Sequence, residues 1–198
     1  LSSILLMQKL IIKGNKKLSG SINISGSKNA TLPILAATLL TDKVVTLKNV
    51  PFVQDVHTMI NLLKFIGLNI EISKKSKTLK ISSNRELKTI APYNLLKTMR
   101  AGVLVLGPLL AKYKKAKVSL PGGCAIGARP VNLHLFALEK LGAKIKIKNG
   151  YIHATAKNGL KGNIIKFPFI SVGATENAIL AAVSAKGKTI ISNCAIEP

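Results

Sequence analysis

The sequence contains few of the residues that build several common kinds of site. Two of its 198 residues are cysteines, Cys124 and Cys194, and they stand far apart, which fits neither a metal-ligand pattern nor a disulfide framework. We therefore expect no metal site and a reducing, cytoplasmic compartment. Seven residues are acidic, and no pair of carboxylates has a spacing suited to acid–base catalysis.

The sequence also has no apolar run long enough to cross a bilayer. Its apolar start, residues 1–6, is too short for the core of a signal peptide with a cleavage site, and Met7 is a candidate start residue. With 47% hydrophobic residues the chain can still bury a substantial core, as one large domain or as a domain plus a fragment. We expect a globular protein without a membrane partner.

The charge is strongly positive, because 30 lysines and arginines face 7 acids and give a net charge of +23. A clustered basic face would favour a basic RNA-binding module, which is one alternative. The lysines are instead scattered along the chain and alternate with isoleucine at 144–148, a pattern typical of the solvated face of a strand. We interpret the excess as a composition bias that helps to attract a polyanionic small ligand, and expect no nucleic-acid partner.

A repeated pattern organises the chain. An amphipathic helix, a glycine and an alternating strand occur at 61–72 and return at 137–147, with Gly67 and Gly142 75 positions apart (142 minus 67). Three further helices are nearly apolar all round, which places them inside the protein. These helices are expected at 31–40, 98–111 and 175–184.

The pattern predicts an α/β fold made of β-α-β-α-β-β copies, with three sheets around three buried helices. The copies span about residues 20–90, 91–161 and 162–198, the third being cut short, and together form one domain over 20–198. The first copy opens with a strand at 21–24. The leading segment 1–19 is expected to pair with something outside this domain.

The stretch LPGGCAIGARP at 120–130 is the strongest candidate site. Three glycines within six residues free the backbone, while Pro121 and Pro130 stiffen both ends. The loop presents Cys124, followed five residues later by Arg129, whose guanidinium suits phosphate or carboxylate oxygens. Nearby cations should lower the pKa of the thiol and make it a nucleophile or proton donor. The alternative is that Cys124 is a small buried filler.

Two further stretches offer cations to an anionic ligand. The strand-to-helix turn at 25–30 combines free backbone N–H groups, a helix start, Lys28 and Asn29, although an ordinary N-capping turn would look similar. Arg100 stands before an uncharged apolar run and needs an anionic partner, either a ligand or a structural ion pair. The small, hydroxyl-rich stretch at 171–175 is typical of a loop that admits a ligand.

We expect three other polar residues to have structural rather than catalytic positions. His57 and His134 fall on helices that follow prolines, and we interpret both as helix-face residues rather than catalysts. Asn177, next to Glu176, is expected at a turn.

These motifs together resemble one enzyme family. The stretches 27–34, 97–101, 121–134 and 171–175 match in order and spacing the bacterial UDP-N-acetylglucosamine 1-carboxyvinyltransferases, over about residues 7–198 and the first half of such an enzyme. The resemblance implies an enolpyruvyl-transferase fold, an inside-out α/β barrel in each of two domains, with the substrates between them. It implies transfer of the enolpyruvyl group of phosphoenolpyruvate to the 3-hydroxyl of UDP-N-acetylglucosamine, the first committed step of peptidoglycan synthesis, without a cofactor.

The resemblance also implies roles for individual residues. Cys124 would be the general acid that protonates the phosphoenolpyruvate methylene and can form a covalent adduct, and Lys28, Asn29 and Arg129 would hold phosphoenolpyruvate. The UDP-N-acetylglucosamine contacts would be Arg100, Arg129, Pro130, Val131, Asn132, Leu133, Phe169, Ser171, Val172 and Gly173.

The sequence departs from the family in three ways. Asn132 stands where the family commonly has an aspartate, and Phe169 where a lysine is frequent. The aspartate that acts as base toward the sugar hydroxyl belongs to the family's second domain, so this chain alone is expected to be inactive and to need that domain of the same protein as its partner. Two alternatives remain beside the RNA-binding module: a 5-enolpyruvylshikimate-3-phosphate synthase-like enzyme, whose family lacks the cysteine loop, and a remnant retained for binding only.

Overall fold

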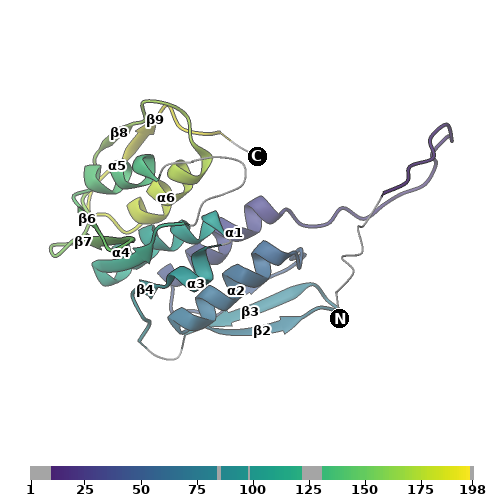
Figure 1. Cartoon of the computed structure of the whole chain (residues 1–198), viewed down its shortest axis with the longest axis horizontal. Coiled ribbons are helices and arrows are strands. Elements are labelled where there is room, and N and C mark those ends of the chain that lie inside the picture. Colours follow the sequence, from purple (N-terminus) through teal and green to yellow (C-terminus); the bar gives the residue numbers. More distant parts are fainter. Residues whose placement is uncertain (1–9, 84–85, 98, 122–130, 197–198) are drawn as a thin grey trace, which may run out of the picture.

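A computed structural model of the chain describes residues 10–83, 86–97, 99–121 and 131–196. Helices and strands are interspersed along these residues, and the strands form three small sheets. Helices α1, α4 and α6 lie between the sheets, where α4 packs against α6 and α1 packs against the start of the segment that leads into α4 (Figure 1). The expected arrangement of sheets around apolar helices is thus confirmed for the described residues.

The first group of elements contains two helices and an antiparallel sheet. Helix α1 (Lys28–Ala37) continues as the 3₁₀ helix η1 (Thr38–Leu40), followed by β1 (Val45–Leu47), α2 (Gln54–Ile66), β2 (Asn69–Ser73) and β3 (Thr78–Ser82). The sheet order is β1-β3-β2. Helix α2 ends at Gly67, whose φ of 128° is open to glycine but strained for other residues, so the predicted glycine stop is confirmed.

The second group repeats this order with additional elements. Strand β4 (Ile90–Ala91) precedes α3 (Tyr93–Leu96), the 3₁₀ helix η2 (Arg100–Val105), α4 (Leu106–Tyr113) and β5 (Lys115–Ser119). Helix α5 (Asn132–Lys140), β6 (Lys144–Lys148) and β7 (Tyr151–Thr155) complete the group. The sheet order is β4-β5-β7-β6, and β4 runs parallel to β5. After α5, Gly142 has a φ of 94°, which matches the role of Gly67.

The third group consists of β8 (Ile164–Lys166), α6 (Val172–Ala182) and β9 (Ile190–Ser192), with β8 and β9 parallel. Helix α6 begins three residues before the expected 175, because Ser171 caps it: the Ser171 hydroxyl accepts a hydrogen bond from the N–H of Ala174. Asn177 lies inside this helix, in agreement with the helix expected at 175–184, whereas its expected place at a turn is wrong.

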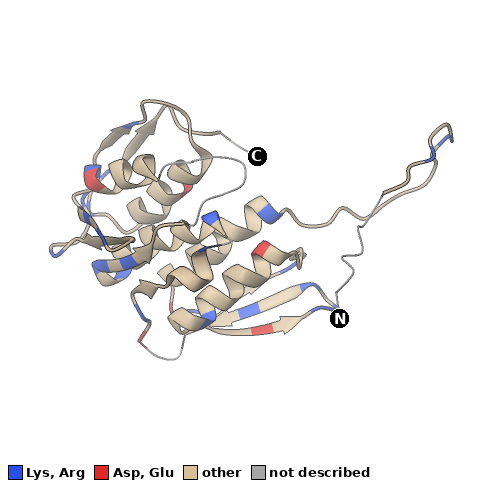
Figure 2. Cartoon of the chain, viewed as in Figure 1, with Lys and Arg blue, Asp and Glu red and all other residues tan. Residues whose placement is uncertain are grey.

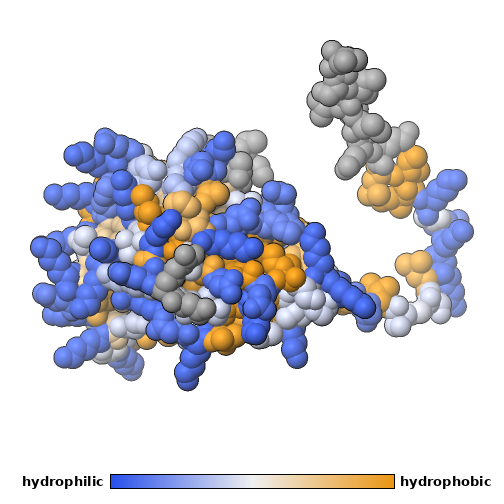
Figure 3. Space-filling view, turned by 90° about the horizontal axis from the view of Figure 1, so that it is seen from below, coloured by the Kyte–Doolittle hydropathy of each residue, from blue (hydrophilic) through white to orange (hydrophobic). Residues whose placement is uncertain are grey.

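The strand expected at 21–24 is absent from the described residues. Residues 10–24 form an arm that leaves the body before α1 (Figure 1), with Ile22 and Ile24 exposed. A strand needs a neighbour for its backbone N–H and C=O groups, and the arm has none among the described residues. Figure 3 shows orange hydrophobic residues along this arm, which include the exposed Leu10, Ile11 and Ile12.

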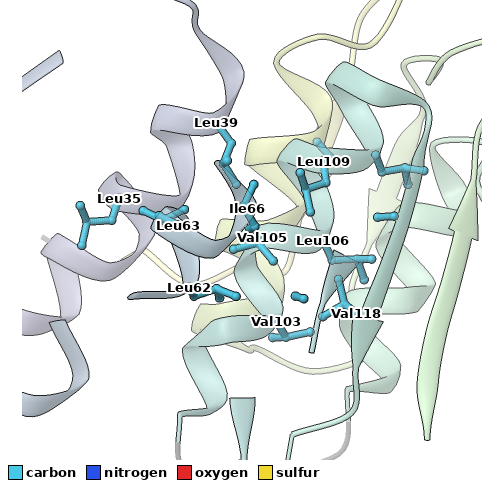
Figure 4. Packing of buried hydrophobic residues seen from close by; sticks show 14 of the residues in the cluster. Leu35, Leu39, Leu62, Leu63, Ile66, Val103, Val105, Leu106, Leu109 and Val118 are labelled. Atoms are coloured by element: carbon cyan, nitrogen blue, oxygen red, sulfur yellow. The ribbon is translucent and has the colours of Figure 1, made fainter. Parts of the chain in front are cut away.

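One hydrophobic core joins the groups. Figure 4 shows Leu35 and Leu39 facing Leu62, Leu63 and Ile66 of α2, while side chains of η2, α4 and β5 continue the packing. Full burial of one such leucine stabilises the fold by about 1.5–3 kcal/mol. Helices α1 and α6 are not buried all round, since Ile34, Ile179 and Val183 are exposed. The expectation that these helices lie wholly inside is therefore correct for one face of each.

The glycine at 142 offers a test of the helix-to-strand turns. A β-carbon added at Gly142 would meet no heavy atom within 4 Å, so Gly142→Ala introduces backbone strain without a clash. We expect it to lower the free energy of unfolding by about 1–3 kcal/mol in urea unfolding followed by circular dichroism. Gly14→Ala, also in open space but at ordinary φ, is the control and should change nothing. Equal stability of both variants would contradict this interpretation.

Candidate functional site

Lys28 and Asn29 form the exposed first turn of α1. Ser27 caps this helix, because its hydroxyl accepts a hydrogen bond from the N–H of Ala30. The Lys28 ammonium donates to a carboxylate oxygen of Asp55 at 2.9 Å, with 47% and 38% of the two side chains exposed. Figure 2 shows the two charges side by side at the starts of α1 and α2. An exposed pair of this kind contributes about 0–1 kcal/mol, so an anionic ligand can displace Asp55 at little cost.

The turn before α1 depends on a close approach of two backbone segments. A β-carbon at Gly26 would collide with the backbone carbonyl oxygen of Asn49, so only glycine fits here. The predicted capping turn and the predicted anion pocket are therefore compatible, since the same turn caps the helix and presents Lys28 to solvent.

Arg100 is the first residue of η2 and is partly buried. Its positive charge acts on His134 of α5, where it adds to the larger effect of burial and lowers the pKa of His134 to about 4. Arg100 thus lies near the start of α5, although 34 positions separate it from His134 in the sequence (134 minus 100). The charge of one residue predicted to bind the UDP-sugar therefore acts on the helix that begins with two others, Asn132 and Leu133.

The residues predicted after the cysteine loop begin helix α5. Val131 precedes the helix, Asn132 is its exposed first residue, and Leu133 is 5% exposed and belongs to the hydrophobic core. Cys124, Arg129 and Pro130 lie outside the described residues.

The last predicted segment starts helix α6. Phe169 and Val172 are exposed and Ser171 is the capping residue. A β-carbon added at Gly173 would lie 3.2 Å from Cε1 of His134, so α6 begins against the histidine ring. Glu176, one turn further on, has a pKa raised by burial.

Sequence reasoning missed the buried polar pair between these helices. Asn177 is fully buried and its amide nitrogen lies 3.1 Å from Nδ1 of His134, which is 7% exposed. His134 does lie on a helix, as predicted, but on the buried face of α5 and paired with a polar side chain of α6. A signal was available, since an asparagine within an otherwise apolar helix must find hydrogen-bond partners when buried.

Other kinds of site find no support in the described ranges. No cluster of three or more metal-ligating side chains occurs among them, and none of their helices has the length and apolar character needed to span a membrane. In Figure 2 the lysines and arginines are scattered over helices, strands and loops of the described residues.

Curated relatives match nearly the whole chain. It is 64% identical to the UDP-N-acetylglucosamine 1-carboxyvinyltransferase of Pelagibacter ubique (strain HTCC1062) and 57% identical to that of Endomicrobium trichonymphae, in each case over 97% of the chain and 46% of the relative. The resemblance inferred from the motifs is thus confirmed. The chain spans about half the length of the curated relatives it matches.

Solved structures show the fold, and a family model shows the family. The chain matches the enolpyruvyl transferase NikO from Streptomyces tendae with a TM-score of 0.75 and 17% identity, covering 90% of this chain and 41% of that one. It matches EPSP synthase from Acinetobacter baumannii with a TM-score of 0.72 and 20% identity, covering 93% and 42%. These likenesses confirm the α/β enolpyruvyl-transferase fold. Because the model described as EPSP synthase (3-phosphoshikimate 1-carboxyvinyltransferase) matches residues 12–198, the chain belongs to that family.

Proposed function

We propose that the chain is the first-domain part of a cytoplasmic UDP-N-acetylglucosamine 1-carboxyvinyltransferase. The observation that carries this proposal is the 64% and 57% identity, over 97% of the chain, to relatives of that name. The cysteine loop at 120–130 adds support, because the competing 5-enolpyruvylshikimate-3-phosphate synthases lack it. In this proposal residues 1–19 and a second domain complete the enzyme.

The proposed reaction is an addition followed by an elimination. The sugar 3-hydroxyl oxygen adds to C2 of phosphoenolpyruvate while Cys124 delivers a proton to the C3 methylene, and loss of a C3 proton with phosphate then restores the double bond. Both substrates are polyanions, so fixed cations that neutralise them serve binding and the redistribution of charge in the transition state. The second domain supplies the base toward the hydroxyl.

The proposed phosphoenolpyruvate site contains Lys28, Asn29 and Arg129. Its support is the exposure of Lys28 at a helix start, where backbone N–H groups favour anions, with Asp55 as a replaceable partner. The proposed UDP-sugar site combines Arg100 and 129–133 with Phe169 and 171–173. Its support is the contact of Gly173 with the ring of His134, on which Arg100 also acts.

The cysteine can be tested by covalent labelling. We expect mass spectrometry of the full-length protein exposed to fosfomycin, an epoxide, to find one adduct, at Cys124, formed faster with UDP-N-acetylglucosamine present. Cys194→Ala should keep the adduct and Cys124→Ala should lose it. The thiol of Cys194, a partly buried residue, lies 3.9 Å from the carbonyl oxygen of Ile191. An unmodified Cys124 would overturn its proposed role.

Lys28 can be tested against a matched ion pair. Lys28→Ala should lower kcat/KM for phosphoenolpyruvate about 10- to 150-fold, the equivalent of one hydrogen bond to a charged group. Asp55→Asn should leave this value unchanged or raised, because it removes only the competitor of the substrate. Lys112→Ala, which breaks the pair with Asp42 at 2.6 Å, is the control and should have no effect. Equal losses in Lys28→Ala and Asp55→Asn would mean that the pair is structural.

A further inference from the structure

Asn177 of α6 is a fully buried carboxamide where four helical segments meet. Its Oδ1 accepts a hydrogen bond from the backbone N–H of Gly107 at 2.8 Å. Its Nδ2 lies 3.1 Å from the carbonyl oxygen of Val103 and 3.1 Å from Nδ1 of His134. One side chain therefore connects α6 with η2, α4 and α5.

The orientation of this carboxamide follows from its two backbone partners. In a continuous α-helix the carbonyl of Val103 would accept the N–H of Gly107, four residues later. Here η2 changes into α4 at this point, and the Asn177 amide bonds to both groups. The oxygen must face the N–H and the nitrogen must face the carbonyl, so the reversed amide is excluded.

Gly107 allows this insertion. A β-carbon there would collide with Oδ1 of Asn177 and lie 2.7 Å from the Asn177 backbone carbonyl oxygen. The backbone of α6 thus approaches α4 more closely than any other residue type would permit.

The fixed amide determines the state of the histidine. Of the two hydrogens on Nδ2, one goes to Val103 and the other points to Nδ1 of His134. Nδ1 must then accept, so the ring carries its proton on Nε2. Burial and the charge of Arg100 lower the pKa of His134 to about 4, in agreement with a neutral ring.

The edge of the ring that carries Nε2 packs against a predicted ligand segment. A β-carbon at Gly173 would lie 3.2 Å from Cε1 and 3.5 Å from Nε2, so this edge of the ring packs against the start of α6. Helix α5 also packs against strands β6 and β8. The ionisable groups on all the packed elements are Arg100 on η2, Lys112 and Tyr113 on α4, Glu139 and Lys140 on α5, Glu176 on α6, Lys144, Lys146 and Lys148 on β6, and Lys166 on β8. Among these, Arg100 is the one whose charge acts on the ring.

We infer that Asn177 is a positioning residue, which holds His134 as the neutral Nε2–H tautomer and so provides a hydrogen-bond donor beside 171–173. The link to sugar-nucleotide binding rests on the proposed function, whereas the tautomer does not. Arg100 then supplies the positive charge beside this segment, and His134 supplies a neutral N–H donor with a fixed orientation.

The first experiment needs no substitution in the network. In the full-length protein labelled with ¹⁵N-histidine, two-bond ¹H–¹⁵N correlation spectra should show a protonated Nε2 and an unprotonated Nδ1 for His134 from about pH 5.5 to about pH 8.5. His134→Gln identifies the signals by their loss. A protonated Nδ1, or titration of the ring in this range, would overturn the inference.

The second experiment exchanges the donor for an acceptor. In Asn177→Asp the carboxylate should draw a proton onto Nδ1 and raise the pKa of His134 into the observable range. The signals of His57 and His153 should be the same in the variant and in the unmodified protein. If the variant folds, its Kd for UDP-N-acetylglucosamine relative to the unmodified protein should fall about five- to tenfold between about pH 8.5 and about pH 5.5, as a charged donor replaces a neutral one.

The outcomes separate the two proposals. An unchanged tautomer in a folded Asn177→Asp variant would reduce Asn177 to a packing residue and overturn the inference. A switched tautomer with a pH-independent ratio of Kd values would overturn the positioning role in binding. Failure of the unmodified protein to bind UDP-N-acetylglucosamine at all would count against the proposed function. The tautomer of His134 would still be tested, because the first experiment needs no ligand.

Discussion

The apolar helices must bury their faces against one another, and this constraint determines where the functional segments lie. Helix α1 packs on η2, and α6 packs on both η2 and α4. Because the predicted ligand segments stand at the starts of α1, η2, α5 and α6, the packing of these helices also sets the positions of those segments. The core thus supports these four predicted segments directly, because each begins a packed helix.

Surface charge contributes little to this architecture. The pairs Lys28–Asp55 and Lys112–Asp42 are at least partly exposed, and such pairs contribute about 0–1 kcal/mol each, less than burial of a single leucine of the core. The many lysines are therefore compatible with the fold, but their ion pairs add little to its stability. The polar group that matters structurally is the uncharged Asn177, since an unsatisfied amide at its depth would cost about 1–3 kcal/mol.

Much of the fold follows from local sequence patterns. The spacing of Gly67 and Gly142 identifies the repeat, and the positive φ of both residues explains why glycine is required at these helix ends. Alternation at 144–148 predicts strand β6 correctly, because side chains of a strand point alternately to opposite faces. These features depend on neighbours within a few residues, which a sequence displays.

The rest depends on contacts between distant residues. The stretch 21–24 reads as a strand, yet strand formation needs a partner that the local sequence does not specify. The bonds of Asn177 to Val103 and Gly107 span 74 and 70 positions, so no local pattern reveals them. Lys28 and Arg100 were predicted for their charge, whereas the ring of His134, which lies against Gly173 and is acted on by the charge of Arg100, emerges only from the packing of the helices.

The most direct test of the proposed activity is a reaction of the full-length protein with phosphoenolpyruvate and either of two acceptors, followed by phosphate release and mass spectrometry of the product. With UDP-N-acetylglucosamine we expect one phosphate per enolpyruvyl ether formed, and with shikimate 3-phosphate we expect neither product. Turnover of shikimate 3-phosphate without turnover of UDP-N-acetylglucosamine would contradict the account.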